Sequence, residues 1–338
     1  MWTSLLPVII AVVSLLCCVS PSDSAPRRKA PARIAVLMVT GMPGETYHSV
    51  GLGMASMWTT RLRAEGIQVS AAESEGSREN LEAVRINDAD LILTEALPAD
   101  AAYFGKGKYK ERPLTELRSI ANLWQDTLHV VIRADKRKTG TLEDLTALVL
   151  ATGPSESGNS FTTQLLLKSL NSGARDVGLR YMSPMAAIEA FRKGTVEAIV
   201  STGGIPVPLV TAVFKEAHQP VGLLEVTDHQ LDAVRRAGWT NALRCVIPSS
   251  TYAGLTTDVA TIGQQSLLAV AGSLEDEVVY ALTRTLFENL DYLARVHPAC
   301  RHVTLEGALS GLRIPLHPGA QRYYNERRVP IPEHLNPR

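Results

Sequence analysis

The stretch TGMPGETYHSVG, residues 40–51, follows an apolar run at 33–39 and leads into a helical pattern over 49–63. Its glycines at 41, 44 and 51 allow a sharp turn and a close approach of the backbone to a bound group. The helix behind the loop directs unpaired amide hydrogens toward that group. The pattern predicts a ligand loop that favours anions such as carboxylate or phosphate, although a plain strand-to-helix turn has the same composition.

The overall composition is that of a globular protein with a substantial core. The chain has 338 residues, 45% of them hydrophobic, and this length suggests two domains. The formal net charge is zero and the sequence pI is about 7.1. We therefore expect no nucleic-acid partner, because a nucleic-acid binder needs a basic surface.

The N-terminus carries an apolar run at residues 2–19, followed by small polar residues at 20–25. This pattern predicts a secretory signal peptide over residues 1–24 and a periplasmic protein. An uncleaved membrane anchor is the alternative, because the run approaches the length of a transmembrane span.

Cys245 and Cys300 are the cysteines that remain after the leader. In an oxidising compartment they form either a disulfide or two buried thiols, and the sequence leaves both open. Their spacing is not of a zinc-binding type, and we expect neither a metal nor a cofactor.

β-Branched runs alternate with amphipathic segments along the chain, which is typical of βαβ units. The first set comprises strands at 33–39, 67–72 and 89–94, with helical segments at 49–63 and 80–86. The second set comprises strands at 147–152, 179–182 and 196–201, with helices at 160–170 and 185–193. We predict two lobes: 33–122 with 245–326, and 123–244.

Segments 117–123 and 128–133 are expected to cross between the lobes, and a strand at 243–247 to carry the chain back. An apolar stripe over 278–293 predicts one long helix. The Pro-rich segment 327–338 is predicted to be an extended surface tail.

Three further glycine- or serine-containing loops lie at strand ends. Ser157, Gly158 and Asn159 precede a helix, Gly203 and Gly204 follow the strand at 196–201, and Ser77 and Asn80 belong to a polar loop at 73–80. Ligands collect at this edge of open α/β sheets. Helix capping alone also explains such residues.

The chain lacks the sequence signatures of a hydrolase. It contains neither a Gly-x-Ser-x-Gly elbow nor a His-Glu-x-x-His pair. His48, His129 and His317 are individually interpreted as structural. Loops that surround a cleft suit binding of a small solute better than catalysis, so we expect a protein that is not an enzyme.

Several segments together resemble the TAXI family of TRAP-transporter solute receptors. They are GETY at 44–47, GSRENL at 76–81, ADL at 89–91, IRAD at 132–135, EVVYALTRTLFENLD at 277–291 and IPLHPGAQRYY at 314–324. The resemblance implies a two-lobed periplasmic binding protein type II-like α/β fold, with a mixed sheet flanked by helices in each lobe and a ligand cleft between them. It also implies a monomeric receptor that delivers a glutamate-like amino acid or a dicarboxylate to a TRAP-type permease.

Carried onto this chain, the resemblance assigns ligand binding to two loops and to one residue of the crossing strands. These residues are Thr40, Gly41, Gly44, Thr46, Tyr47, Ser157, Gly158, Asn159 and Tyr252. Glu45, His48 and Glu95 replace residues usual in the family and are added to the candidate site. Because Glu45 and Glu95 bring negative charge, a cationic or zwitterionic solute also has to be considered.

Two other functions compete with the receptor interpretation. One is an exported α/β hydrolase, which predicts product formation and an essential histidine. The other is a ligand sensor that presents its closed form to a membrane signalling partner.

Overall fold

The computed structural model describes residues 33–170, 176–216 and 218–337, so the predicted signal peptide lies outside the described residues. The strands are β1 (Ile34–Val39), β2 (Ile67–Ala72), β3 (Leu91–Glu95), β4 (Leu117–Arg133), β5 (Val149–Thr152), β6 (Gly178–Tyr181), β7 (Ala198–Gly203), β8 (Val221–Leu223), β9 (Leu243–Ile247) and β10 (Val259–Ala271). The α-helices are α1 (Thr46–Arg61), α2 (Ser77–Arg85), α3 (Ala96–Tyr103), α4 (Gly158–Ser169), α5 (Pro184–Arg192), α6 (Pro208–Glu216), α7 (Asp228–Ala237), α8 (Asp276–Glu288), α9 (Leu290–Val296) and α10 (Pro318–Glu326).

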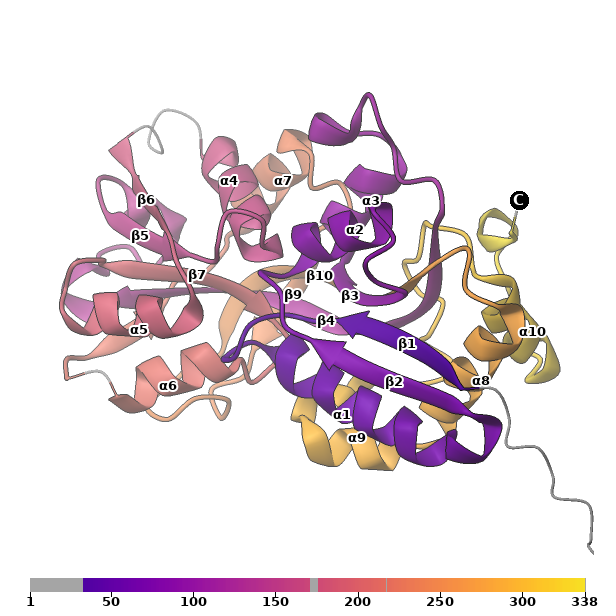
Figure 1. Ribbon diagram of the computed structural model, residues 1–338. Helices are drawn as coiled ribbons and strands as arrows, with labels where there is room; N and C mark the ends of the chain where they lie inside the picture. The colour runs from indigo at the N-terminus through magenta and orange to yellow at the C-terminus, as the bar shows by residue number, and fades with distance from the viewer. Residues whose placement is uncertain (1–32, 171–175, 217, 338) are drawn as a thin grey trace, which may run out of the picture. The chain divides into compact units, whose positions relative to one another are not determined.

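The ten strands of the described residues belong to one mixed sheet with the order β2-β1-β3-β10-β4-β7-β5-β6, while β8 pairs with β4 and β9 with β10. In the first half of the sheet, β1 is parallel to β2 and β3. In the second half, β5 is parallel to β6 and β7. These parallel groups belong to opposite ends of the strand order (Figure 1). The expected α/β fold with mixed strand pairing is confirmed.

The antiparallel pair of β4 and β10 joins the two halves. The crossing segments predicted at 117–123 and 128–133 are parts of the single strand β4, which pairs with β10 on one edge and with β7 on the other. The prediction that 243–247 carries the chain back is wrong. β9 pairs with β10, and β10 makes the return. Polar residues at 264–266 interrupt the apolar pattern of β10, which hid this strand from sequence analysis.

The buried apolar residues form separate clusters on the two sides of the β4–β10 crossing. One cluster gathers residues from 36–124 and 267–335, including Trp58 and Tyr324. The other two clusters consist of residues between 128 and 262, and one of them also includes Leu97. Strand β4 therefore passes from the first cluster to another between Trp124 and Leu128, and β10 passes back between Ile262 and Leu267. The lobe boundaries themselves remain a prediction.

The C-terminal region differs from its prediction at two points. The long helix expected over 278–293 is interrupted at Asn289, whose φ of −131° is not helical, so α8 and α9 are separate. In the described part of the tail, residues 327–337, the chain is not merely an extended surface segment. Its 3₁₀ turn, Glu333–Leu335, buries Leu335 completely, and the Leu335 carbonyl accepts a 2.8 Å hydrogen bond from the Leu316 amide.

Cys245 and Cys300 are separate buried thiols, so of the two alternatives the structure shows the one without a disulfide. Burial raises the pKa of each thiol to about 12. In the part of the chain that the structure describes, no helix combines the length and apolarity that a membrane crossing requires.

The buried position of Leu335 leads to a stability prediction. Leu335→Ala leaves a cavity in the apolar cluster that contains Trp58 and Tyr324. Such changes cost about 2–5 kcal/mol of stability. We expect the free energy of unfolding in urea to fall by at least about 2 kcal/mol. Glu333→Ala, at an exposed position in the same turn, is the control. Equal stability of the two variants would show that the tail contributes nothing to the fold.

Candidate functional site

Loops at the ends of β1, β3, β5 and β7, the start of α2 and the middle of β4 enclose one cavity. Its lining residues are Glu45, Thr46, Tyr47, Glu75, Gly76, Ser77, Glu95, Asp126, Ser157, Gly158, Asn159, Thr202 and Gly203. The enclosed volume is about 20 Å³. This volume accommodates about one water molecule, so the two sides of the cavity are in close contact.

The strand register brings the polar groups of the cavity to one level of the sheet. Glu95 ends β3 opposite Ser266 of β10, and Gln264, two residues earlier, lies opposite Asp126 of β4. On the other edge of β4, Thr127 lies opposite Gly203 of β7. Neighbouring strands thus place Glu95, Asp126 and the end of β7 close together.

Two acidic side chains of the first half contact the second half directly. The Thr202 hydroxyl donates to Glu95 Oε1, and the Thr162 hydroxyl donates to Oε2 at 3.3 Å. The Asn159 amide nitrogen donates to Glu45 Oε1 at 3.2 Å, while the Met42 amide donates to Oε2 at 3.0 Å. These carboxyl groups therefore bridge the two halves of the sheet.

Asp126 lies in the middle of β4 and is 1% exposed. The Tyr47 hydroxyl donates to its Oδ2 at 2.5 Å, and the Trp124 indole donates to its Oδ1 at 2.8 Å. Tyr47 and Trp124 also pack edge to face, with ring centroids 6.1 Å apart. These contacts fix the Asp126 carboxyl at the bottom of the cavity.

The cavity is acidic and has no basic lining residue. The pKa of the Glu45 carboxyl is raised to about 7, mainly by burial and in part by the charge of nearby Asp126. Burial also raises the pKa values of Glu95 and Asp126 above their ordinary values, and the Asp126 charge adds to the effect on Glu95. Protons are retained because a buried carboxylate without a counter-ion is costly.

Two glycines allow the close packing around these carboxyl groups. A Cβ on Gly158 would lie 2.5 Å from Glu95 Oε2 and 2.7 Å from Ser77 Oγ. A Cβ on Gly204 would lie 2.7 Å from Trp124 Nε1. Real Cβ atoms do not approach so closely, so any larger residue would force the two sides apart.

The structure brings nine of the sixteen predicted site residues into the cavity lining: Glu45, Thr46, Tyr47, Ser77, Glu95, Ser157, Gly158, Asn159 and Gly203. Their role in ligand binding stays a prediction. Gly41 and Gly204 are not part of the lining: Gly41 packs closely against the Glu45 side chain and Gly204 against Trp124. The carbonyl of Gly44 accepts from the Leu209 amide, which ties the first loop to the second half.

The other four predicted residues contact groups outside the cavity lining. Asn80 is buried and donates to the carbonyls of Thr40 and Leu93, so it holds adjacent strand ends together. His48 contacts Glu73 at 3.3 Å. The Tyr252 hydroxyl accepts from the Val207 amide and lies 2.8 Å from His129 Nε2, and Tyr252 belongs to one of the two apolar clusters of the second half.

Four lining residues were not among the predicted site residues: Glu75, Gly76, Asp126 and Thr202. Glu75 and Gly76 lie in the loop predicted at 73–80, and Thr202 directly precedes Gly203. Asp126 was hidden because it lies inside a strand, between the two segments predicted as separate. Two signals were available for it. An acidic residue between the apolar runs 117–123 and 128–133 is unusual in a buried strand, and Trp124, two residues away, shares its face.

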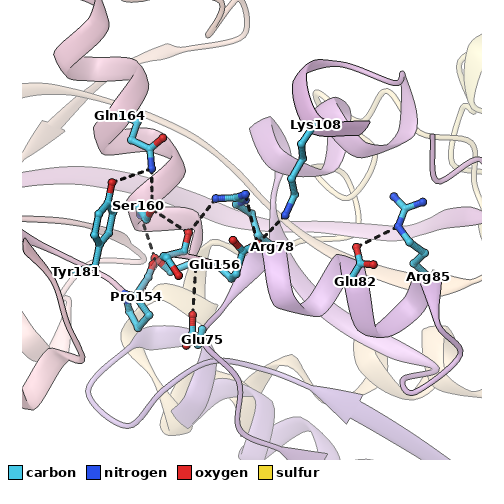
Figure 2. Close-up of polar contacts among 12 residues, drawn as sticks. Glu75, Arg78, Glu82, Arg85, Lys108, Pro154, Glu156, Ser160, Gln164 and Tyr181 are labelled. Carbon is cyan, nitrogen blue, oxygen red and sulfur yellow. Dashed lines mark hydrogen bonds and ion pairs between the residues drawn. The ribbon is translucent and has the colours of Figure 1, made fainter. Parts of the chain in front are cut away.

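Polar contacts also join the two halves at the rim of the cavity (Figure 2). Lys108 Nζ lies 2.6 Å from Glu156 Oε2, and an Arg78 guanidinium nitrogen lies 3.3 Å from the same oxygen. The amides of Arg78 and Glu79, in the first turn of α2, both donate to the Glu156 carbonyl at 3.1 Å. The Glu156 amide donates to Glu75 Oε2 at 3.2 Å.

The retained protons predict a pH-dependent stability. A carboxyl whose pKa is raised in the folded state keeps its proton where the unfolded chain has lost it, so stability falls as pH rises through this range. For Glu45 the range extends from 4.5 to about 7. We expect the free energy of unfolding, measured in urea without added solute, to decrease between pH 5 and pH 7.5.

The Glu95→Gln variant tests the origin of this dependence. Because one pKa unit corresponds to about 1.4 kcal/mol, we expect the decrease in the variant to be smaller by at least about 1 kcal/mol. Glu73→Gln, an exposed control, should follow the parent protein. A parent whose stability does not fall over this range contradicts the prediction.

Comparison with solved structures places this architecture among transporter binding proteins. A binding protein component of an ABC phosphonate transporter from Pseudomonas aeruginosa aligns with 12% identity and a TM-score of 0.51, covering 78% of each chain. An L-cystine ABC transporter protein from Listeria monocytogenes aligns with 11% identity and a TM-score of 0.48, covering 78% of this chain and 93% of that one. The periplasmic aliphatic sulphonate binding protein from Escherichia coli aligns with 15% identity and a TM-score of 0.46, covering 90% of this chain and 96% of that one.

At identities this low the similarity shows the fold alone. It rests on the Pseudomonas protein, whose TM-score is 0.51. A sequence-family model gives the stronger result. It matches residues 38–327, which are most of the chain, and the protein therefore belongs to the NMT1-like family.

Proposed function

We propose that the protein is a periplasmic solute-binding receptor that captures a small polar solute in the cavity and delivers it to a membrane permease. The observation that carries the proposal is the cavity itself, which polar loops from both halves of the sheet enclose. Ligand sites of small molecules are concave and carry a few convergent polar groups, as this one does.

A solute larger than a water molecule can reach the cavity only if its two sides separate. The rim contacts permit this, because exposed ion pairs such as Lys108–Glu156 contribute about 0–1 kcal/mol. The β4–β10 crossing offers a hinge, since both strands continue from one hydrophobic cluster into the other. Hinge closure around a ligand is a common response in two-lobed binding proteins.

The arrangement supports binding in preference to catalysis. His129 is buried, and burial lowers its pKa to about 4. Its ring contacts Tyr252 and the Thr127 carbonyl instead of a cavity residue. No histidine is among the described residues that line the cavity with Ser77 and Ser157, so the cavity lacks the essential histidine that the hydrolase alternative predicts.

The class of permease is a separate part of the proposal. The sequence resemblance to TAXI receptors supports a TRAP-type permease, which is driven by an ion gradient. The Pseudomonas relative belongs to an ABC transporter, so the ATP-driven alternative has to be tested directly. Uptake into vesicles that contain the cognate permease, driven by an ion gradient or by ATP, separates the two.

A disulfide across the cavity tests whether the halves must separate. A Cβ on Gly203 would lie 3.8 Å from the Thr46 Cβ, the usual separation in a disulfide. We expect a Thr46→Cys, Gly203→Cys double variant to lose solute binding when oxidised and to regain it on reduction.

The single variants and the parent, treated with the same oxidant, are the controls. Binding can be followed by calorimetry with a solute found in a thermal-shift screen, because a ligand that binds the native state raises the melting temperature. Undiminished binding by the fully cross-linked protein would exclude the proposed opening. Conversion of a solute to product would favour an enzyme.

A further inference from the structure

We infer that the cavity selects a solute that carries a protonated amine, held among the carboxyl groups of Glu45, Glu95 and Asp126, and that it rejects dicarboxylates. This inference rests on the proposed function and narrows its substrate class. It departs from the dicarboxylate expectation that came from the family resemblance.

The first step is the supply of hydrogen-bond donors around the three carboxyl groups. Each of the six carboxyl oxygens accepts from a neutral group: Met42, Asn159, Thr162, Thr202, Tyr47 or Trp124. Among the residues that the structure describes, no lysine, arginine or histidine lines the cavity. The carboxyl groups are therefore hydrogen-bonded but have no counter-ion in the cavity.

The basic side chains nearest the rim are paired with other acids. Lys108 and Arg78 contact Glu156, and His48 contacts Glu73. Both acids are absent from the cavity lining. A dicarboxylate would add two negative charges to a buried acidic site without gaining a cation, which is costly in a low-dielectric environment.

The contacts of Thr202 give an independent indication that the site holds an additional hydrogen. Its Oγ1 approaches both Glu95 Oε1 and Asn159 Oδ1, the latter at 2.6 Å. A hydroxyl has a single hydrogen to donate. Only one of these contacts can use the Thr202 hydrogen, so the pair is favourable when Glu95, a residue that is 4% exposed, is protonated and donates to Thr202 Oγ1 instead of accepting from it.

An ammonium group would meet the requirements of these carboxyl groups. It supplies three donors and the missing positive charge, and charge-assisted hydrogen bonds are stronger than neutral ones. On binding, it would replace protons now held by the carboxyl groups. A metal ion is less suitable, because within the described residues no group of three or more Asp, Glu, His or Cys side chains has an arrangement that could hold one.

Main-chain amides can accommodate a second, anionic end of the same solute. Thr46 and Tyr47 open α1, and Gly158 and Asn159 open α4, and all four line the cavity. First-turn amides have no partner within their helix and favour negative charge. Zwitterions are therefore compatible with the inference, provided that they carry the amine.

The test uses solutes that differ only in charge. Succinate, 4-aminobutanoate and 1,4-diaminobutane share a four-carbon chain, and equivalent sets with two to six carbons, together with the common α-amino acids, extend the series. We expect melting temperatures to rise, and calorimetric binding to be saturable, only with amine-bearing members.

Binding of simple dicarboxylates without binding of amines would overturn this inference and leave the receptor function intact. Binding by no member of the series would count against both. The two failures are therefore distinguishable.

Charge-neutral variants identify the carboxyl groups responsible. For the best amine, Asp126→Asn and Glu45→Gln should each weaken binding by on the order of 30-fold or more, as expected when one partner of a buried charge pair is removed. Glu73→Gln lies outside the cavity and should bind as the parent does. Circular dichroism melting confirms that the variants are folded, and unchanged affinity in both folded cavity variants would contradict the assignment.

A pH titration gives a second readout. The titratable groups that line the cavity are Glu45, Tyr47, Glu75, Glu95 and Asp126. Raising the pH from 6 to 8 removes protons that compete with the amine, so affinity for the amine should increase. Calorimetry in buffers of different ionisation enthalpy should show proton release, and proton uptake on binding would refute the exchange.

Discussion

The hydrogen-bonded crossing of β4 and β10 is the constraint on which the rest of the structure depends. These two strands are the central members of the sheet, and each continues from one hydrophobic cluster into the other. Their register also sets the position of Asp126 relative to Glu95. One strand pair therefore joins the halves and aligns the groups of the cavity.

The cavity combines two electrostatic tendencies that act in opposite directions. Burial disfavours the charged forms of Glu45 and Glu95, which explains why their pKa values are raised. The same residues are the N-caps of α1 and α3, where the helix dipole favours negative charge. The helix dipoles do not compensate for burial, because the pKa values of both carboxyl groups remain above their ordinary values.

The sequence was most informative where a loop follows a short apolar strand. The patterns around 40–51 and 155–160 placed Glu45, Tyr47, Gly158 and Asn159 correctly near strand ends, because glycine and helix-capping residues report local backbone geometry. The continuity of β4 and the existence of β10 were not predictable in this way. Key polar residues of both strands have partners distant in sequence: Asp126 accepts from Tyr47, 79 residues away, and Gln264 accepts from the Leu97 amide, 167 residues away.

Side-chain identity alone also could not assign His48 and Tyr252. Both are polar aromatic residues near predicted loops. His48 pairs with Glu73, whereas Tyr252 contacts Val207 and His129 in the second half of the protein. Such assignments depend on the direction of a side chain, which tertiary packing determines. A spacing pattern contains no information about it.

The seam between α2 and Glu156 has a consequence for how this family member tolerates mutation. Two of its bonds run from main-chain amides to a main-chain carbonyl, so they persist whatever side chains occupy positions 78, 79 and 156, proline at the donor positions excepted. Replacement of the charged side chains around the mouth of the site would therefore change the ion pairs there but leave these two main-chain bonds in place. The contact between α2 and Glu156 thus depends on the backbone and not on the side chains at these positions.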